Sequence, residues 1–108
     1  MLKKLSDRLL TSDAIDLDAE RRSERADIER VLESWNLLSA REKEVARGVA
    51  EGKLNKQIAY DMNISEKTVI AHRGTLCRKL GIRSAADITR MLLTVEKEEK
   101  EAARRQGA

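Results

Sequence analysis

The sequence contains no proline and no phenylalanine, and its only aromatic residues are one tryptophan and one tyrosine. Without proline, no residue of the chain forces a break in a helix. A charged fraction of 38% together with only five glycines is typical of helical proteins. No segment alternates apolar and polar residues as a half-buried strand does. We therefore predict an all-α fold.

Cysteine and histidine are equally scarce, since Cys77 and His72 are the only ones. A lone cysteine cannot form an intrachain disulfide, and one cysteine with one histidine cannot complete a structural zinc site. The chain also lacks a glycine-rich phosphate loop and a nucleophile paired with a base. We expect His72 and Cys77 to pack within the fold, and we expect no enzymatic activity, cofactor, metal or small-molecule substrate.

Long apolar runs are missing as well. No segment approaches the about 20 apolar residues that cross a bilayer, and residues 1–7 lack the apolar core of a secretory signal. We therefore expect a cytoplasmic protein that does not contact a membrane. A length of 108 residues leaves room for one small domain with extensions.

The net charge of +3 is unevenly distributed along the chain. Residues 1–36 hold 7 basic and 9 acidic side chains, and residues 93–108 hold 4 of each. Residues 37–92 hold 11 basic and 6 acidic side chains, a net charge of +5. Such a basic segment indicates a surface that binds phosphate groups, as in nucleic-acid-binding proteins.

The basic segment also has the pattern of a helix-turn-helix, in which two short helices cross at a steep angle. Asn63 stands where the turn needs a positive φ, which asparagine tolerates. Ser65 is placed to cap a second helix over residues 66–80, which Gly81 ends. Apolar or compact residues recur at the offsets at which the two helices make contact: Ile58, Ala59, Met62, Ile64, Val69 and His72.

A further helix is expected on each side of this pair. Upstream, Ser39 and Glu42 have the spacing of a capping box, and Gly52 ends the helix that they begin. Downstream, Ser84 and Asp87 begin a last helix with an apolar stripe of Ile88, Met91, Leu92 and Val95. The central unit is therefore predicted to contain four helices.

The N-terminal region predicts a linker helix that leads into this unit. Apolar residues from Ile28 to Leu38 recur at spacings of three and four, whereas Arg21 and Glu24 at the preceding positions do not support an extended coiled coil. Trp35 is expected to pack this helix onto the core. The predicted regions are a helical extension over 1–36, a domain over 37–95 and a charged tail over 96–108.

Five groups of residues resemble the LuxR-type DNA-binding domain of bacterial response regulators, most closely its FixJ/NarL subgroup. They are LSAREKEV at 38–45, NKQIA at 55–59, ISEKTV at 64–69, HR at 72–73 and KLG at 79–81. The resemblance implies a sequence-specific transcriptional regulator with double-stranded DNA and RNA polymerase as partners. It also implies pairing of two copies through the last helix, at Ile88, Met91, Leu92 and Val95. The chain is too short to hold a receiver domain as well, so we expect a free-standing output domain or the C-terminal part of a longer ancestor.

The helix over 66–80 is the expected recognition helix in the major groove. At about 100° per residue its apolar stripe lies opposite Lys67, Ala71, Gly74 and Arg78, with Ile70 and Thr75 at the margins. Resemblance to the family also implies that Ile70, Ala71 and Gly74 point toward the bases. Many relatives have long polar residues in place of Ile70 and Gly74, so apolar contact with thymine methyl groups is expected here. The residues expected to contact phosphates are Asn55, Lys56, Thr68, Arg73 and Lys79.

Two other interpretations stay open. A sigma-factor region-4-like module shares the opening LSAREKEV and a similar turn, although His72, Arg73 and the KLG ending favour the LuxR type. A helical adaptor would bind another regulator through Val31, Trp35 and the last helix. DNA affinity at low salt distinguishes the adaptor from a DNA-binding protein.

Overall fold

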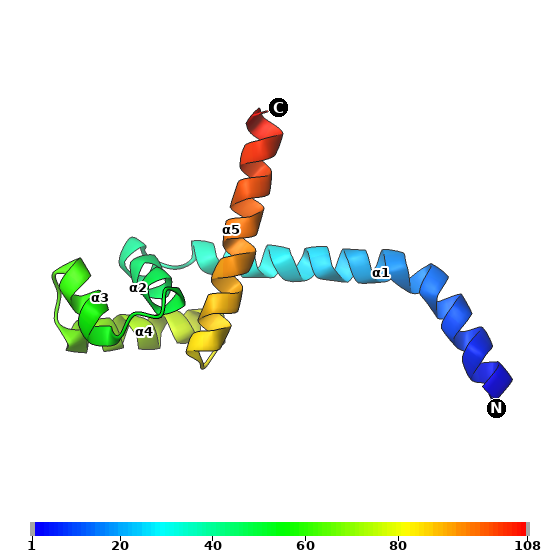
Figure 1. The fold of residues 1–108 in the computed structure, drawn as a ribbon, viewed down its shortest axis with the longest axis horizontal. Helices are drawn as coiled ribbons and strands as arrows, with labels where there is room; N and C mark the ends of the chain where they lie inside the picture. Colours follow the sequence, from blue (N-terminus) through cyan, green and yellow to red (C-terminus); the bar gives the residue numbers. More distant parts are fainter. Residues whose placement is uncertain (1, 108) are drawn as a thin grey trace. The chain divides into compact units, whose positions relative to one another are not determined.

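The computed structural model describes the backbone of residues 2–107 and the side chains of residues 17–107. Figure 1 shows the helices in chain order, and the described residues contain no strand. The all-α prediction is therefore confirmed. The helices are α1 (Leu2–Asn36), α2 (Ala40–Ala50), α3 (Asn55–Met62), α4 (Glu66–Leu80) and α5 (Ala85–Gly107). None of the helices in the described part of the chain is long and apolar enough to cross a membrane.

The chain divides into two units, one ending at Arg30 and the other beginning at Val31. In the first unit, the described side chains of residues 17–30 are exposed except for the half-buried Ala26 and Ile28. The second unit contains the last residues of α1 and the four helices α2 to α5. Helix α5 passes residue 96 without a break, so the predicted charged tail continues this helix as far as Gly107.

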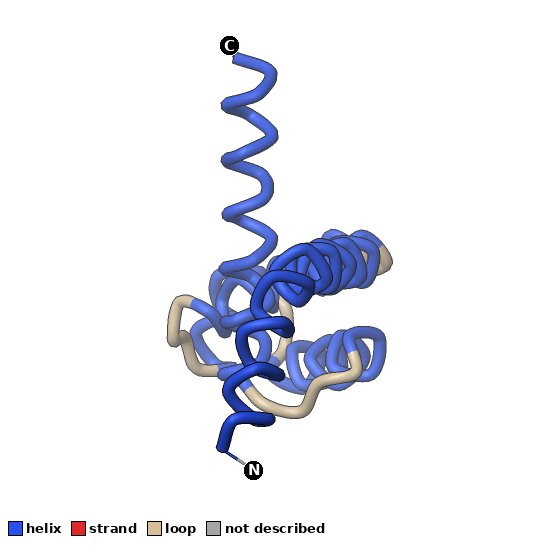
Figure 2. Tube along the Cα trace, turned by 90° about the vertical axis from the view of Figure 1, so that its right-hand side faces the viewer, coloured by secondary structure: helices blue, strands red, loops and turns tan. Residues whose placement is uncertain are grey.

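The helix ends follow the local signals in the sequence, and Figure 2 shows the short loops that join the helices. Ser39 Oγ accepts the Glu42 N–H at 3.1 Å, and Ser65 Oγ accepts the Thr68 N–H at 3.1 Å. Asn63 has φ 56° and ψ 46°, the left-handed conformation predicted for the turn. Gly81 ends α4 with φ 66°. Ser84 Oγ accepts the Asp87 N–H at the start of α5.

The hydrophobic core of the second unit collects side chains from all of its helices. Trp35 from the end of α1 is 4% exposed and belongs to this core, as predicted. Its indole ring also lies 5.7 Å from Lys43 Nζ and 5.6 Å from the Arg47 guanidinium, both on α2. The remaining buried apolar residues are Leu38, Val45, Ala46, Val49, Ile58, Ala59, Met62, Val69, Leu76, Ile88, Leu92 and Val95.

Helices α2 and α3 approach each other closely at Gly48, a contact that the sequence pattern did not indicate. A Cβ atom on Gly48 would lie 2.7 Å from Ile58 Cγ1 and 3.0 Å from Ile58 Cδ1. Ile58 is itself fully buried, so this site has no room for a side chain. The bare backbone at Gly48 therefore fixes how closely α3 packs against α2.

Candidate nucleic-acid interface

Helix α4 has one buried and one exposed face. Val69 and Leu76 have no exposed surface, which confirms the predicted register of this helix. On the opposite side Ile70 is 57% exposed although it is apolar. We call the face formed by Lys67, Ile70, Ala71, Gly74 and Arg78 the outer face; all are exposed except Gly74, which is half-buried. The structure thus brings Ile70, Ala71 and Gly74, which were expected to point toward the bases, together with Lys67 and Arg78 on one face.

Asn55 and Arg73, two of the expected phosphate ligands, contact each other. Arg73 Nη1 donates a hydrogen bond to Asn55 Oδ1 at 3.0 Å, which joins the middle of α4 to the first residue of α3. Lys56, the next residue, is exposed, and among the described residues neither Lys56 nor Arg73 forms an ion pair. Their positive charges are therefore available to a ligand.

Thr68, a further expected phosphate ligand, takes part in the cap of α4. Its backbone N–H donates to Ser65 Oγ at 3.1 Å, and the two hydroxyl oxygens are 2.8 Å apart. The side chain is half-buried at the start of the helix. The capping interaction holds the Thr68 side chain in place at the N-terminal end of α4, where Lys67 begins the outer face.

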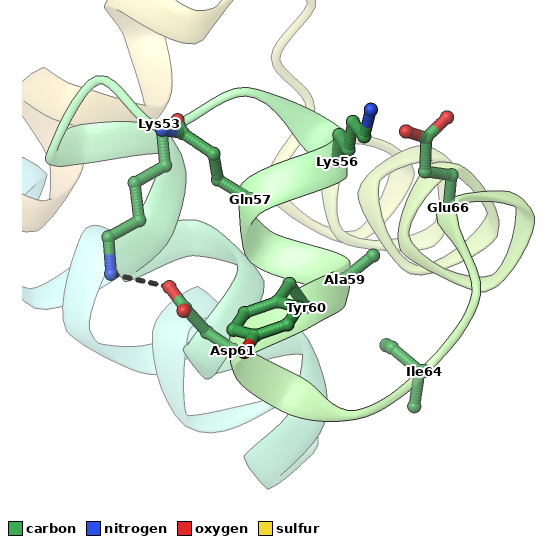
Figure 3. A pocket seen from close by; sticks show the side chains of 8 residues that line it. All are labelled: Lys53, Lys56, Gln57, Ala59, Tyr60, Asp61, Ile64 and Glu66. Atoms are coloured by element: carbon green, nitrogen blue, oxygen red, sulfur yellow. Dashed lines mark hydrogen bonds and ion pairs between the residues drawn. The ribbon is translucent and has the colours of Figure 1, made fainter.

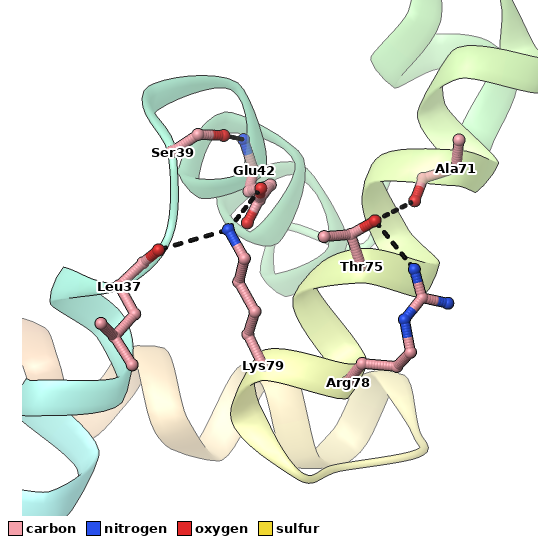
Figure 4. A network of polar contacts seen from close by, with 7 residues as sticks. All are labelled: Leu37, Ser39, Glu42, Ala71, Thr75, Arg78 and Lys79. Carbon is pink, nitrogen blue, oxygen red and sulfur yellow. Dashed lines mark hydrogen bonds and ion pairs between the residues drawn. The ribbon is translucent and has the colours of Figure 1, made fainter.

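Lys79 differs from the other expected phosphate ligands because its amine is bound within the protein (Figure 4). Lys79 Nζ lies 2.9 Å from Glu42 Oε1 and 3.3 Å from the Leu37 carbonyl oxygen. These contacts join the end of α4 to the start of α2 and to the loop after α1. A role in binding phosphate stays a prediction for Lys79, and the structure gives its amine an internal partner.

The Glu42 carboxylate is the buried half of this ion pair. Its side chain is only 7% exposed, whereas that of Lys79 is 37% exposed. Burial by itself raises the pKa of Glu42, but hydrogen bonds from Lys79 and Ser39 and the positive charge of Lys79 outweigh it, so the pKa lies below its ordinary value. Glu42 is therefore ionised at neutral pH and depends on Lys79 for its main compensating charge.

The comparisons with known proteins identify the family of this chain. The sequence profile of the family described as bacterial regulatory proteins, luxR family, matches residues 36–92, more than half of the chain. The chain belongs to the LuxR family. Helices α2, α3 and α4 lie wholly within the matched residues. The family assignment made from the sequence motifs is confirmed.

Several relatives of this LuxR-family chain are response regulators. The response regulator TodT of Pseudomonas putida is 37% identical over 78 residues, which are 72% of this chain and 34% of TodT. The transcriptional regulatory protein FixJ of Rhizobium meliloti is 43% identical over 56 residues, 52% of this chain and 28% of FixJ. The structure of the response regulator StyR matches at a TM-score of 0.67 and 32% identity, over 85% of this chain and 46% of that one. The chain spans about a third of the length of these two curated relatives.

The last helix of this LuxR-family domain uses most of its expected pairing residues in its own core. Ile88, Leu92 and Val95 are buried, and Met91 is half-buried. A second copy cannot reach the three buried side chains while the domain is folded. Leu93 on the same helix is 59% exposed. Pairing through this helix stays a prediction, and Leu93 and the accessible part of Met91 are apolar surface that it could use.

An open pocket lies beside the outer side of α3, and sequence reasoning did not single it out (Figure 3). Tyr60 lines the pocket and is 86% exposed. Lys53 lies 2.9 Å from Asp61 and 3.1 Å from Glu51, and hydrogen bonds to both raise the pKa of its amine. Lys53 is therefore paired, whereas Lys56, the other lysine that lines this pocket, forms no ion pair among the described residues.

Proposed function

We propose that this LuxR-family chain is a sequence-specific transcriptional regulator that inserts α4 into the major groove of double-stranded DNA. The observation that carries the proposal is the outer face of α4, which is exposed along the helix while the opposite face has no exposed surface at Val69 and Leu76. A major groove about 12 Å wide accepts one α-helix, and such a helix must keep one face free of core contacts.

The charges around the outer face support this orientation. Lys67 lies at the N-terminal end of the face, and Lys56 and Arg73 lie beside it, all three without an ion pair among the described residues. Phosphate groups border the groove on both sides, so Lys56 and Arg73 would bind the DNA backbone and set the register of the helix. Asn55 and Thr68 belong to the same set because they lie at the starts of α3 and α4.

The bases would be read by the exposed residues between these cations. Ile70 and Ala71 offer methyl groups and no hydrogen-bond donors, and thymine is the base with a methyl group in the major groove. An isoleucine that is 57% exposed gains little from the fold itself, so burial against a ligand would be favourable. The residues proposed to face the bases are Lys67, Ile70, Ala71, Gly74 and Arg78.

The remaining partners belong to the same proposal. TodT is named a response regulator, and FixJ is named a transcriptional regulatory protein. By analogy with them we propose that this chain acts on transcription in the cytoplasm, together with RNA polymerase, and that two copies pair on adjacent half-sites. The adaptor alternative loses support because Trp35, which it requires as a contact residue, is buried in the core.

Binding of the 108-residue chain to random and selected duplexes over a range of salt concentrations would test the proposal. The parent should bind with an affinity that falls as salt rises. Lys56→Ala should weaken binding to all sequences about equally and reduce the salt slope by about 1, because it removes one phosphate contact.

Lys100→Ala is a matched control, since Lys100 is an exposed lysine on α5, away from the outer face of α4. It should change neither the affinity nor the salt slope. If the parent shows little affinity at low salt, the DNA-binding proposal is wrong and the adaptor alternative is favoured. If Lys100→Ala lowers the slope as much as Lys56→Ala, binding is a general property of the basic chain and the interface is misplaced.

A further inference from the structure

A chain of two hydrogen bonds controls the position of Arg78 on α4 (Figure 4). Thr75 Oγ1 donates to the Ala71 carbonyl oxygen at 3.1 Å, and Arg78 Nη2 donates to Thr75 Oγ1 at 3.1 Å. Because the hydroxyl proton of Thr75 is directed at the backbone, the lone pairs of its oxygen remain for Arg78. These two hydrogen bonds, which we call the relay, therefore hold the guanidinium group in one orientation relative to the helix backbone.

Gly74 provides the space that this position of Arg78 requires. Apart from its two chain neighbours and the backbone of its own helix, a Cβ atom on Gly74 would meet only Arg78 Nη1, at 3.6 Å. A methyl group at that distance is in ordinary van der Waals contact, but a longer side chain would occupy the place of the guanidinium group. Side chains on a helix lean toward its N-terminus, so Arg78 reaches back from the last turn of α4 to Gly74.

The remaining N–H groups of Arg78 are free to bind a ligand. Thr75 accepts a hydrogen bond from one nitrogen only, and among the described residues Arg78 forms no ion pair. Its side chain is exposed on the outer face. A guanidinium group held in one orientation presents two parallel donors, and O6 and N7 of guanine are the pair of acceptors that they match in the major groove.

Resting on the proposed DNA-binding function, we propose that Gly74 and Thr75 position Arg78 to recognise a guanine next to the bases that Ile70 and Ala71 contact. Thr75 is a positioning residue in this proposal, since it acts through Arg78. The sequence alone placed Arg78 opposite the apolar stripe of this helix and predicted mainly thymine contacts, from apolar side chains. The structure carries the guanidinium group of Arg78 back along the helix to Gly74, toward Ile70 and Ala71, so that the proposed guanine lies next to the thymines.

The test is selection of bound duplexes, followed by titration of the selected site and of the same site with the guanine replaced by adenine. The parent should prefer guanine by about 5- to 150-fold. Thr75→Val keeps the shape of the side chain and removes the hydroxyl, so the preference should fall by about 2- to 10-fold as the arginine regains its rotamer freedom. Thr75→Ser keeps the relay and should restore the preference.

Thr89→Val is the matched control, because the Thr89 hydroxyl makes the same type of backbone hydrogen bond, to Ala85 on α5. It should leave the guanine preference unchanged. The salt slope should stay constant in Thr75→Val, since no phosphate contact is lost. A salt-dependent parent that selects no guanine, or a Thr75→Val variant with the parent's guanine preference, would overturn this inference and leave the proposed function intact. A parent without DNA affinity would overturn both.

Discussion

Replacing Lys79 by methionine should destabilise the domain because it leaves the Glu42 carboxylate buried without its cation. The carboxylate is 7% exposed, and Lys79 Nζ is 2.9 Å from its Oε1 atom. Removing one partner of a buried ion pair costs about 3 to 5 kcal/mol. Lys79 is 37% exposed, so water can approach the vacated position and the expected loss is smaller, about 2 to 3 kcal/mol. Small domains have a total stability of about 5 to 15 kcal/mol, so this loss is readily measured.

Urea unfolding of four proteins would isolate the interaction. The parent, Lys79→Met, Glu42→Gln and the double variant form a cycle in which the double variant removes both charges. The double variant should be more stable than Lys79→Met, because it no longer contains an uncompensated buried charge. If Lys79→Met unfolds at the same urea concentration as the parent, the ion pair contributes nothing, and the amine of Lys79 is free for phosphate as the sequence suggested.

The pH dependence gives an independent check with opposite signs in the two proteins. In the parent the pKa of Glu42 is lowered, so its contribution is present above the ordinary value of 4.5 and is lost as pH falls through the lower folded pKa. In Lys79→Met burial acts without the lysine, so the pKa of Glu42 should rise above 4.5. The stability deficit of the variant should then grow as pH increases from about 4 toward neutrality. A deficit that is constant across this range would contradict the reasoning.

Four further substitutions test the packing, each by urea unfolding. Gly48→Ala should cost about 1 to 2 kcal/mol, because the new methyl group lies 2.7 Å from Ile58 Cγ1 and the strain exceeds the gain in helix propensity. Gly74→Ala should instead stabilise the domain by up to about 1 kcal/mol, since alanine is the better helix former and the new methyl group meets only Arg78. Equal changes in stability at the two glycines would contradict the close packing at Gly48. Leu76→Ala should cost about 2 to 5 kcal/mol because the side chain is fully buried. Ile70→Ala should change stability by less than about 0.5 kcal/mol because that side chain is exposed. Similar losses in the two variants would show that the register of α4 is wrong.

The sequence predicted the features that depend on neighbouring residues. The caps at Ser39, Ser65 and Ser84 were recognisable because each hydroxyl accepts an N–H only three residues away. Asn63 was recognisable because few residue types tolerate a positive φ. The buried face of α4 followed from helical periodicity, which needs no information beyond the helix itself.

Contacts between distant residues were not predictable in this way. Lys79 and Glu42 are 37 positions apart, and nothing in the local pattern of either residue identifies the other. A capping-box glutamate and a basic residue at the end of a recognition helix each have a sufficient local explanation, so their pairing stayed hidden. The apolar stripe of α5 had the same ambiguity, because periodicity marks Ile88 and Leu92 as inward-facing without saying whether the domain or a second copy covers them.

The last turn of α4 shows why the number of basic residues is a poor guide to the proposed DNA interface. Arg78 and Lys79 are adjacent, but successive residues of a helix point about 100° apart. Arg78 therefore extends over the outer face toward Gly74, whereas Lys79 turns to α2 and neutralises Glu42. Lys53 is likewise committed to Asp61 and Glu51. These two lysines are thus paired within the fold, and the proposed affinity for DNA would depend on cations such as Lys56, Lys67 and Arg78, which form no ion pair among the described residues.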